Sequence, residues 1–217
     1  MRAILLALLW LAVSCAPAAA ACEPPRGWVD VPHPQVAPAG ELVSHSEDIV
    51  IARPLASVLK TVVAMDLHHT IKPTSALPGV EGTYLLTKET KTFGAPGSRQ
   101  FDCLSDGSTL EEQALERRES AHDFQFRYVV WNYTSEAAHP IRYGVGDFQY
   151  HAIDATHTLI HWTYSFALDR TRFPGYLGGL GNFLFRVVFL DRQYAELMKG
   201  VLAGYGRAAA LPIASGS

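Results

Sequence analysis

The chain has 217 residues, of which 48% are hydrophobic and 18% are charged, and its formal net charge at neutral pH is −3. These values are typical of a globular protein with one well-buried core and a single domain. Lys and Arg form no run or stripe in the sequence, which argues against nucleic acid or anionic lipid as a partner.

Residues 1–21 have the features of a secretory signal peptide. A short basic start precedes an unbroken apolar run over residues 3–13, and four alanines follow at residues 18–21. The run is shorter than the roughly 20 residues that a membrane-spanning helix needs, and the alanines match the A-x-A arrangement that a signal peptidase cuts. We therefore expect cleavage near Ala20 or Ala21 and a periplasmic or secreted protein.

The chain contains three cysteines, which leave two alternatives open. If Cys15 leaves with the signal peptide, an oxidising compartment would permit one disulfide between Cys22 and Cys103. Lipoprotein processing at Cys15 or Cys22 is the other alternative, because each follows a small residue. A lipid anchor is thus possible, although no transmembrane segment is expected in the mature chain.

The first part of the mature chain indicates an arm followed by a strand and a helix. Residues 22–43 are rich in proline and are predicted to form an extended arm. Residues 47–52 predict a first strand, and apolar residues at helical spacing predict a short helix over residues 55–65. An irregular connection over residues 68–79 follows.

After residue 79 the pattern changes to a period of two, with turn signals about every ten residues, which predicts an antiparallel meander. The predicted strands cover residues 82–92, 98–104, 109–117, 123–133, 142–152 and 158–168. Helical periodicity then returns over residues 182–205, with Asn182 as the expected cap. A helix of this length can cross the whole face of the sheet.

The glycine-rich segment 174–182 lies between the last predicted strand and the last helix. It is not a dinucleotide-binding loop, because such a loop requires a parallel βαβ unit. Its glycines and apolar residues favour a flexible lip over a cavity mouth or a weak membrane-touching patch.

A distinctive series of residues surrounds the predicted hairpin over residues 98–117. It consists of Gly97-Ser98, Leu104-Ser105-Asp106-Gly107-Ser108, Glu111-Glu112 and the run from Phe124 to Val130. This series resembles the polyketide cyclase/dehydrase group of the START and pollen-allergen superfamily, and the similarity covers about residues 44–208. The resemblance implies an α+β helix-grip fold, in which a curved antiparallel sheet of six to seven strands wraps around a long C-terminal helix and encloses an internal cavity.

We expect the helix-grip domain to span residues 44–210 and residues 211–217 to form a disordered tail. In relatives with a similar hairpin, a charged residue often points into the cavity, and Arg99 and Glu112 most nearly match that position. The period of two does not decide between Glu111 and Glu112, since a single bulge would exchange them. A solvated ion pair across the two strands is the alternative interpretation.

Aromatic residues on two predicted strands suggest the remaining wall of the cavity. Tyr128 and Asn132 share one face of their strand, and Trp162, Tyr164 and Phe166 share a face of another. Buried Tyr and Trp need hydrogen-bond partners, so several of them facing one interior suggest a ligand site with a few polar anchors. Plain packing against the last helix is the alternative.

Other types of site are poorly supported. The nine histidines show no metal-ligand spacing, no G-x-S-x-G elbow is present, and no redox cofactor is implied. The leading hypothesis is an exported carrier that holds a small hydrophobic or amphipathic molecule. The first alternative is an enzyme that uses the cavity for a cyclase-like, dehydratase-like or hydrolytic reaction, with Glu112 and Arg99 as its catalytic residues. The second is a lipid-anchored protein that binds a partner protein.

Overall fold

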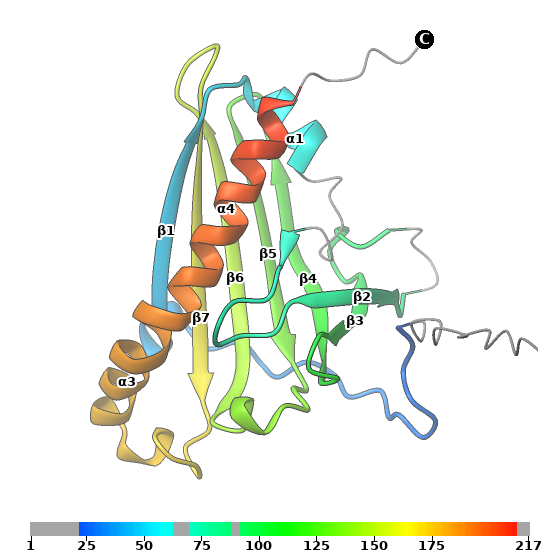
Figure 1. Ribbon diagram of the computed structural model, residues 1–217, viewed down its shortest axis with the longest axis vertical. Coiled ribbons are helices and arrows are strands. Elements are labelled where there is room, and N and C mark those ends of the chain that lie inside the picture. Colours follow the sequence, from blue (N-terminus) through cyan, green and yellow to red (C-terminus); the bar gives the residue numbers. More distant parts are fainter. Residues whose placement is uncertain (1–21, 63–69, 88–91, 212–217) are drawn as a thin grey trace, which may run out of the picture.

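The computed structural model describes residues 22–62, 70–87 and 92–211. A seven-stranded antiparallel sheet packs against a long C-terminal helix, which confirms the predicted helix-grip architecture (Figure 1). The strand order is β1-β7-β6-β5-β4-β3-β2, so the first strand lies beside the last and the others form a meander. The predicted signal peptide and Cys15 lie outside the described residues.

The strands follow the predicted order, with small differences at their ends. They are β1 (Val43–Ile51), β2 (Val80–Leu85), β3 (Arg99–Leu104), β4 (Thr109–Glu119), β5 (Asp123–Trp131), β6 (Ile141–Ala152) and β7 (Thr158–Leu168). Strand β2 stops at Leu85 instead of residue 92, and residues 88–91 of that prediction lie outside the described part. Strand β1 starts four residues earlier than predicted, because its ladder with β7 begins at Val43. Its polar residues His45 and Glu47 face the helical region and form ion pairs with it.

The helices are α1 (Leu55–Val62), α3 (Gly179–Phe185) and α4 (Ala195–Ala210), with a π-helical segment, Arg186–Tyr194, joining the last two. Short 3₁₀ turns occur at Ala39–Glu41, Glu136–Ala138 and Gly175–Leu177. The prediction that Asn182 caps the last helix is wrong. Gly178, at φ 61°, precedes the helix in a conformation that glycine adopts readily, so the helix begins three residues earlier. Asn182 lies inside α3.

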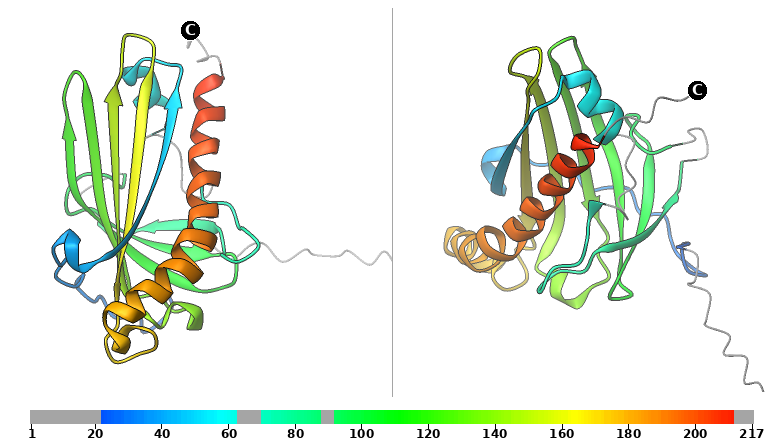
Figure 2. Two further views of the ribbon diagram at one scale, coloured as in Figure 1. Left: turned by 90° about the vertical axis from the view of Figure 1, so that its left-hand side faces the viewer. Right: turned by 45° about the horizontal axis from the view of Figure 1, so that its top comes forward.

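The C-terminal helix runs along one face of the sheet, while the opposite face is turned away from it (Figure 2). Aromatic rings from neighbouring strands form much of the core on the helix side, including Phe148 and Trp162, whose ring centroids lie 4.5 Å apart. A smaller core on the opposite face contains Val129, Trp131 and Tyr143. The sheet is therefore covered on both faces.

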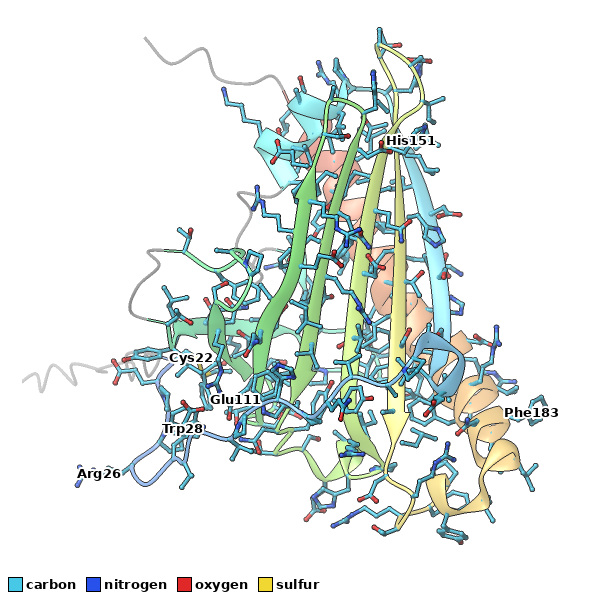
Figure 3. The ribbon with its side chains drawn as sticks, turned by 180° about the vertical axis from the view of Figure 1, so that it is seen from behind. Cys22, Arg26, Trp28, Glu111, His151 and Phe183 are labelled. Carbon is cyan, nitrogen blue, oxygen red and sulfur yellow. A yellow bond between two sulfur atoms is a disulfide. The ribbon has the colours of Figure 1, made fainter. Side chains whose placement is uncertain are left out.

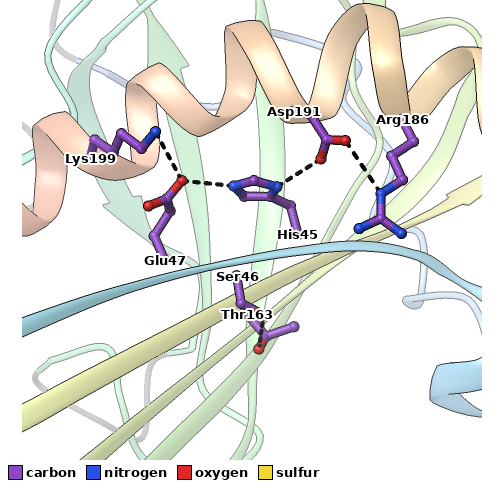
Figure 4. A network of polar contacts seen from close by, with 7 residues as sticks. All are labelled: His45, Ser46, Glu47, Thr163, Arg186, Asp191 and Lys199. Atoms are coloured by element: carbon purple, nitrogen blue, oxygen red, sulfur yellow. Dashed lines mark hydrogen bonds and ion pairs between the residues drawn. The ribbon is translucent and has the colours of Figure 1, made fainter.

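Ion pairs join the edge strand β1 to the C-terminal helical region (Figure 4). The His45 ring lies 2.8 Å from both the Glu47 and the Asp191 carboxylates. Lys199 reaches Glu47 at 3.4 Å, and Arg186 reaches Asp191 at the same distance. The network crosses from the strand to both the π-helical segment and α4, and so fixes the helix over this edge of the sheet.

Candidate functional site

The residues predicted to form one polar site lie on opposite faces of the sheet. Gln100 pairs with Glu112 across β3 and β4, and Phe101 pairs with Glu111. Because successive residues of a strand alternate between faces, Glu112 faces the helix while Glu111 and Arg99 face away from it. The prediction that Arg99 and Glu112 meet inside one cavity is therefore wrong.

On the face away from the helix, Arg99 and Glu111 form an ion pair beneath the N-terminal arm (Figure 3). The two side chains meet at 2.6 Å, and Arg99 also contacts Asp30 at 2.5 Å. The second oxygen of Glu111 accepts hydrogen bonds from Asn132 Nδ2 at 2.7 Å and from Trp28 Nε1 at 3.2 Å. Glu111 is fully buried, so the alternative of a solvated pair is also wrong. Arg99 thus attaches the arm to the sheet through Asp30, while Asn132 supports the Glu111 carboxylate that the arm residue Trp28 also contacts.

The arm is fixed at several further points. A disulfide joins Cys22 to Cys103 on β3, the pairing that sequence analysis left open. The Trp131 indole donates to the Val31 carbonyl at 3.1 Å, and the backbone N–H of residue 37 donates to the Tyr143 hydroxyl at 2.9 Å. The sulfur of Cys22 is occupied by the disulfide, so in this structure Cys22 is not available for acylation.

On the helix side, Glu112 is the centre of a buried acidic group. Gln100 donates a hydrogen bond to Glu112 at 2.9 Å, and the side chain of Asp102 forms another with it. Burial raises the pKa of Glu112 to about 7, against the lowering effect of these two hydrogen bonds. Two carboxyl groups can share a hydrogen bond only if one of them carries a proton, so the pair retains a proton near neutral pH.

Five tyrosines from the sheet and the C-terminal helical region lie near this acidic pair, three of them buried and two, Tyr133 and Tyr194, half-buried. These tyrosines are Tyr128, Tyr133, Tyr164, Tyr194 and Tyr205. Burial raises the pKa of each of them, and the negative charge of Glu112 raises the pKa further at all of them except Tyr164. The rings of Tyr164 and Tyr194 lie 4.6 Å apart, and the buried Tyr133 hydroxyl has no hydrogen-bond partner among the described residues. The interior therefore combines a protonated carboxyl group with several neutral hydroxyls.

The sequence indicated only part of this cluster. Glu112, Tyr128 and Tyr164 were predicted site residues, whereas Tyr194 and Tyr205 lie within the predicted helix over residues 182–205 and were not. The helical periodicity was the available signal, because a tyrosine on the buried face of a helix brings its hydroxyl toward the core. Strand alternation puts Gln100 and Asp102 on one face of β3, but nothing in the sequence shows that this face is the inner one.

The remaining predicted ligand residues, Trp162 and Phe166, are buried in the aromatic core. Trp162 stacks on Phe148, and Phe166 packs edge-on against Phe185, with centroids 5.5 Å apart. These contacts match the alternative of plain packing, and a contact of either residue with a ligand stays a prediction.

A hollow of about 370 Å³ lies between the segment from Thr70 to Thr74 and α4. Leu197 and Val201, both buried core residues, lie at its floor, and Gly200 and Gly204 leave the helix backbone between them uncovered. The hollow opens at the surface. A second one, of about 320 Å³, lies between the end of β1 and the end of α4 and is also open.

The raised pKa of Glu112 gives a testable pH dependence of stability. Between pH 4.5 and pH 7 the folded protein holds a proton that the unfolded chain releases, so the free energy of unfolding falls as the pH rises. By pH 8 this loss amounts to about 3 kcal/mol. We expect Glu112→Gln to remove it, and urea unfolding at pH 5 and pH 8 measures the difference between the variant and the wild type.

Glu119→Gln is the matched control, because Glu119 lies on the same strand and its side chain is 59% exposed. It should leave the pH dependence of the wild type unchanged. Equal pH dependence in the wild type and Glu112→Gln would show that Glu112 titrates in its ordinary range.

Comparison with solved structures identifies the fold. The chain is similar to Ara h 8.0201, with 15% identity and a TM-score of 0.52 over 77% of this chain and 97% of that one. It is similar to the Thalictrum norcoclaurine synthase, with 9% identity and a TM-score of 0.51 over 81% and 97%. The di-domain ARO/CYC protein StfQ of the steffimycin biosynthetic pathway gives 13% identity and a TM-score of 0.52 over 77% and 51%.

These matches confirm the helix-grip fold. No family model and no curated protein matches the sequence. Within the described ranges, no group of three or more His, Cys, Asp or Glu side chains is placed to hold a metal ion. The helices of the described part are too short or too polar to cross a membrane.

Proposed function

We propose that this chain is an exported carrier that holds a small amphipathic molecule between the sheet and the C-terminal helix, with Glu112 as its polar anchor. The observation that carries this proposal is the pair of buried carboxyl groups, Glu112 and Asp102, of which Glu112 accepts a hydrogen bond from Gln100 near several tyrosines. Buried carboxyl groups are costly for stability, and such groups are concentrated at functional sites.

The chemistry of the inner face defines the class of ligand. A protonated carboxyl group and tyrosine hydroxyls donate hydrogen bonds to carbonyl or hydroxyl oxygens, while the surrounding rings of Phe148 and Trp162 favour a flat apolar body. A molecule with a ring system and one or two oxygen substituents meets both requirements. Above pH 7 the loss of the Glu112 proton would weaken its binding.

The hollow beside α4 is the proposed entrance. Its floor of Leu197 and Val201 belongs to the same core as the aromatic rings of the sheet, and its rim carries Lys72 and Arg207. An apolar floor with a charged rim suits an amphipathic molecule that enters with its apolar part first. The helix presents no side chain at Gly200, where an added Cβ would meet no atom within 4 Å.

The proposal of export rests on the N-terminal sequence and on the disulfide. Disulfides persist mainly in oxidising compartments, and Cys22–Cys103 attaches the arm directly after the predicted cleavage site. The periplasm or the cell exterior fits this chemistry. Retention of a lipid anchor would instead require Cys15, whose surroundings lie outside the described residues.

Native mass spectrometry of the protein exported from its own host tests the carrier. We expect a complex that releases a small molecule of defined mass on denaturation. Glu112→Gln should lower the loaded fraction, whereas Glu119→Gln should not. Gly200→Leu, which fills the hollow, should lower loading as well, and Gly200→Ala is its matched control because it adds little volume. A wild-type protein with the mass of the bare mature chain would contradict the carrier.

A second candidate function is proton-transfer catalysis in the same site. The pKa of Glu112, raised to about 7, is suited to a general acid or base at neutral pH. Arg99 is not a partner in this chemistry, since it lies on the other face of the sheet. Norcoclaurine synthase and the ARO/CYC protein StfQ show that the fold supports synthesis in other chains.

The two functions differ in what happens to the released molecule. A carrier returns it with unchanged mass and absorbance after incubation, whereas an enzyme converts it. If it is converted, we expect the rate to change with a pKa near 7 and this inflection to disappear in Glu112→Gln. Conversion by Glu112→Gln with the pH profile of the wild type would exclude Glu112 as the acid or base.

A further inference from the structure

Large hydrophobic side chains are exposed at one end of the molecule. Half of the exposed large hydrophobics among the described residues lie between residues 173 and 188, and they are Phe173, Tyr176, Leu177, Leu180, Phe183 and Val188. We call this set the apolar tip. Both Phe173 and Phe183 are about 60% exposed, although phenylalanine is usually buried. A concentration of this kind usually marks an interaction surface.

The apolar tip is part of a convex projection formed by the turn after β7 and by α3 (Figures 1 and 2). Phe183 points outward from it, away from the sheet (Figure 3). Leu180 and Phe183 lie three residues apart and therefore share one face of α3. The Arg170 guanidinium holds the projection together by donating to the Gly175 carbonyl at 3.1 Å and to Asn182 Oδ1 at 3.3 Å.

The charge around the apolar tip is opposite in sign to that of the whole chain. Residues 169–192 contain four arginines and two aspartates, whereas the complete chain has a net charge of −3. Arg172 and Arg186 contact the two aspartates at 3.4 Å each, and their own side chains remain more than half exposed. The sequence-based expectation of no basic cluster overlooked this group, because the arginines are spread over a long stretch that the fold brings to one end.

We propose that the apolar tip docks on the surface of an anionic lipid bilayer. A convex projection can contact a flat membrane, and the exposed aromatic and aliphatic side chains of the apolar tip then insert into the membrane interface. Arg172 and Arg186 then lie at the level of the lipid phosphates, to which guanidinium groups donate paired hydrogen bonds. The contact is peripheral and involves no spanning helix. The net positive charge of this end favours an anionic over a neutral membrane.

Vesicle flotation with the full chain tests the proposal, using vesicles of phosphatidylcholine alone and of equal parts phosphatidylcholine and phosphatidylglycerol. We expect stronger partitioning onto the anionic vesicles, with the difference reduced at high salt. Leu180→Ser/Phe183→Ser should lower the partition coefficient about tenfold or more, because two apolar side chains no longer leave water. The apolar run over residues 3–13 is common to every variant, so differences between variants report on the tip.

The arginines are tested separately. Arg172→Gln and Arg186→Gln should each lower partitioning onto anionic vesicles by about fivefold and leave neutral vesicles unaffected. Val50→Ser/Ile153→Ser is the matched control, since it removes two exposed apolar side chains from another part of the surface and should change nothing. Circular dichroism and thermal melting establish that each variant is folded.

Three results would overturn the proposal. The wild type would fail to bind anionic vesicles, or it would bind neutral and anionic vesicles equally, or the tip and control variants would bind alike. Size-exclusion chromatography distinguishes another occupant: if Leu180→Ser/Phe183→Ser abolishes self-association and leaves vesicle binding unchanged, the tip contacts a second copy of the chain and not lipid. None of these outcomes depends on the occupancy of the Glu112 site.

Discussion

Replacing Arg99 by methionine should lower the free energy of unfolding by about 3–5 kcal/mol, measured by urea unfolding under oxidising conditions. The reason is the fully buried Glu111, whose closest cationic partner is the Arg99 guanidinium at 2.6 Å. Methionine preserves much of the apolar volume but leaves the carboxylate, among the described residues, with the neutral donors Trp28 and Asn132. A buried charge without a counter-charge is strongly destabilising, even where the complete ion pair adds little.

The matched control is Arg117→Met on the neighbouring strand β4. Arg99 lies over the Trp131 ring, and Arg117 lies over that of Phe124. The contact of Arg117 with Glu119, however, is 3.7 Å long and exposed. Its replacement should change stability by about 1 kcal/mol or less. A loss for Arg99→Met no larger than this would show that Glu111 is not held as a buried anion.

A double variant separates the charge from the packing. Arg99→Met/Glu111→Gln should recover part of the stability lost in Arg99→Met, because the neutral amide oxygen of residue 111 still accepts from Trp28 and Asn132. If the double variant loses as much stability as Arg99→Met and Glu111→Gln lose together, the loss in Arg99→Met comes from packing and not from the unpaired carboxylate. This double-mutant cycle therefore measures how strongly the stability of the arm and the sheet depends on the charge of Glu111.

The sequence predicted the sheet well because each strand carries a period of two that ends at a turn. Strand β7 has the predicted bounds, Thr158–Leu168, and the turn between β3 and β4 has Gly107 at φ 81°, as the Ser-Asp-Gly-Ser signal requires. These features are local. The turn chemistry and the alternation need no knowledge of what covers each face.

The polar site was harder to predict because it depends on which face of the sheet is covered by what. In a sheet with one solvent-exposed face, the charged residues of β4 would indicate which face is exposed. Here the arm covers that face, so Glu111 is buried as fully as Glu112 and the alternation of polar and apolar residues is lost. The sequence showed that the two glutamates point in opposite directions, but the tertiary contacts of Trp28 and Gln100 decide which one faces the helix.

Two predicted ligand residues, Arg99 and Asn132, lie on the arm side of the sheet for a related reason. Arg99 and Asn132 were grouped with Glu112 and Tyr128 through the family resemblance and the strand alternation. Asn132 lies just past the end of β5 at φ 54°, where the backbone leaves the strand alternation and turns its side chain toward Glu111. A single left-handed residue at a strand end is enough to change the face, and the sequence alone gives only a weak signal for it.

Removal of the Cys22–Cys103 disulfide is the second change with a large expected effect. The disulfide closes a loop with a sequence separation of 81 residues, and the loss of that constraint on the unfolded chain corresponds to about 4 kcal/mol. We expect Cys22→Ala/Cys103→Ala, made in a Cys15→Ser background so that no other cysteine is present, to lose this amount in urea unfolding. Reducing the wild type should produce a similar loss.

Reduction of the double alanine variant is the control, because a reductant has no disulfide to act on and should leave its unfolding curve unchanged. The loss should also exceed that of the arm contacts alone, which Trp28→Phe probes by removing only the indole donor to Glu111. If the double variant is as stable as its Cys15→Ser parent, the disulfide does not form in solution. In that case Cys22 would again be available for acylation, and the argument from the disulfide for an oxidising compartment would fail.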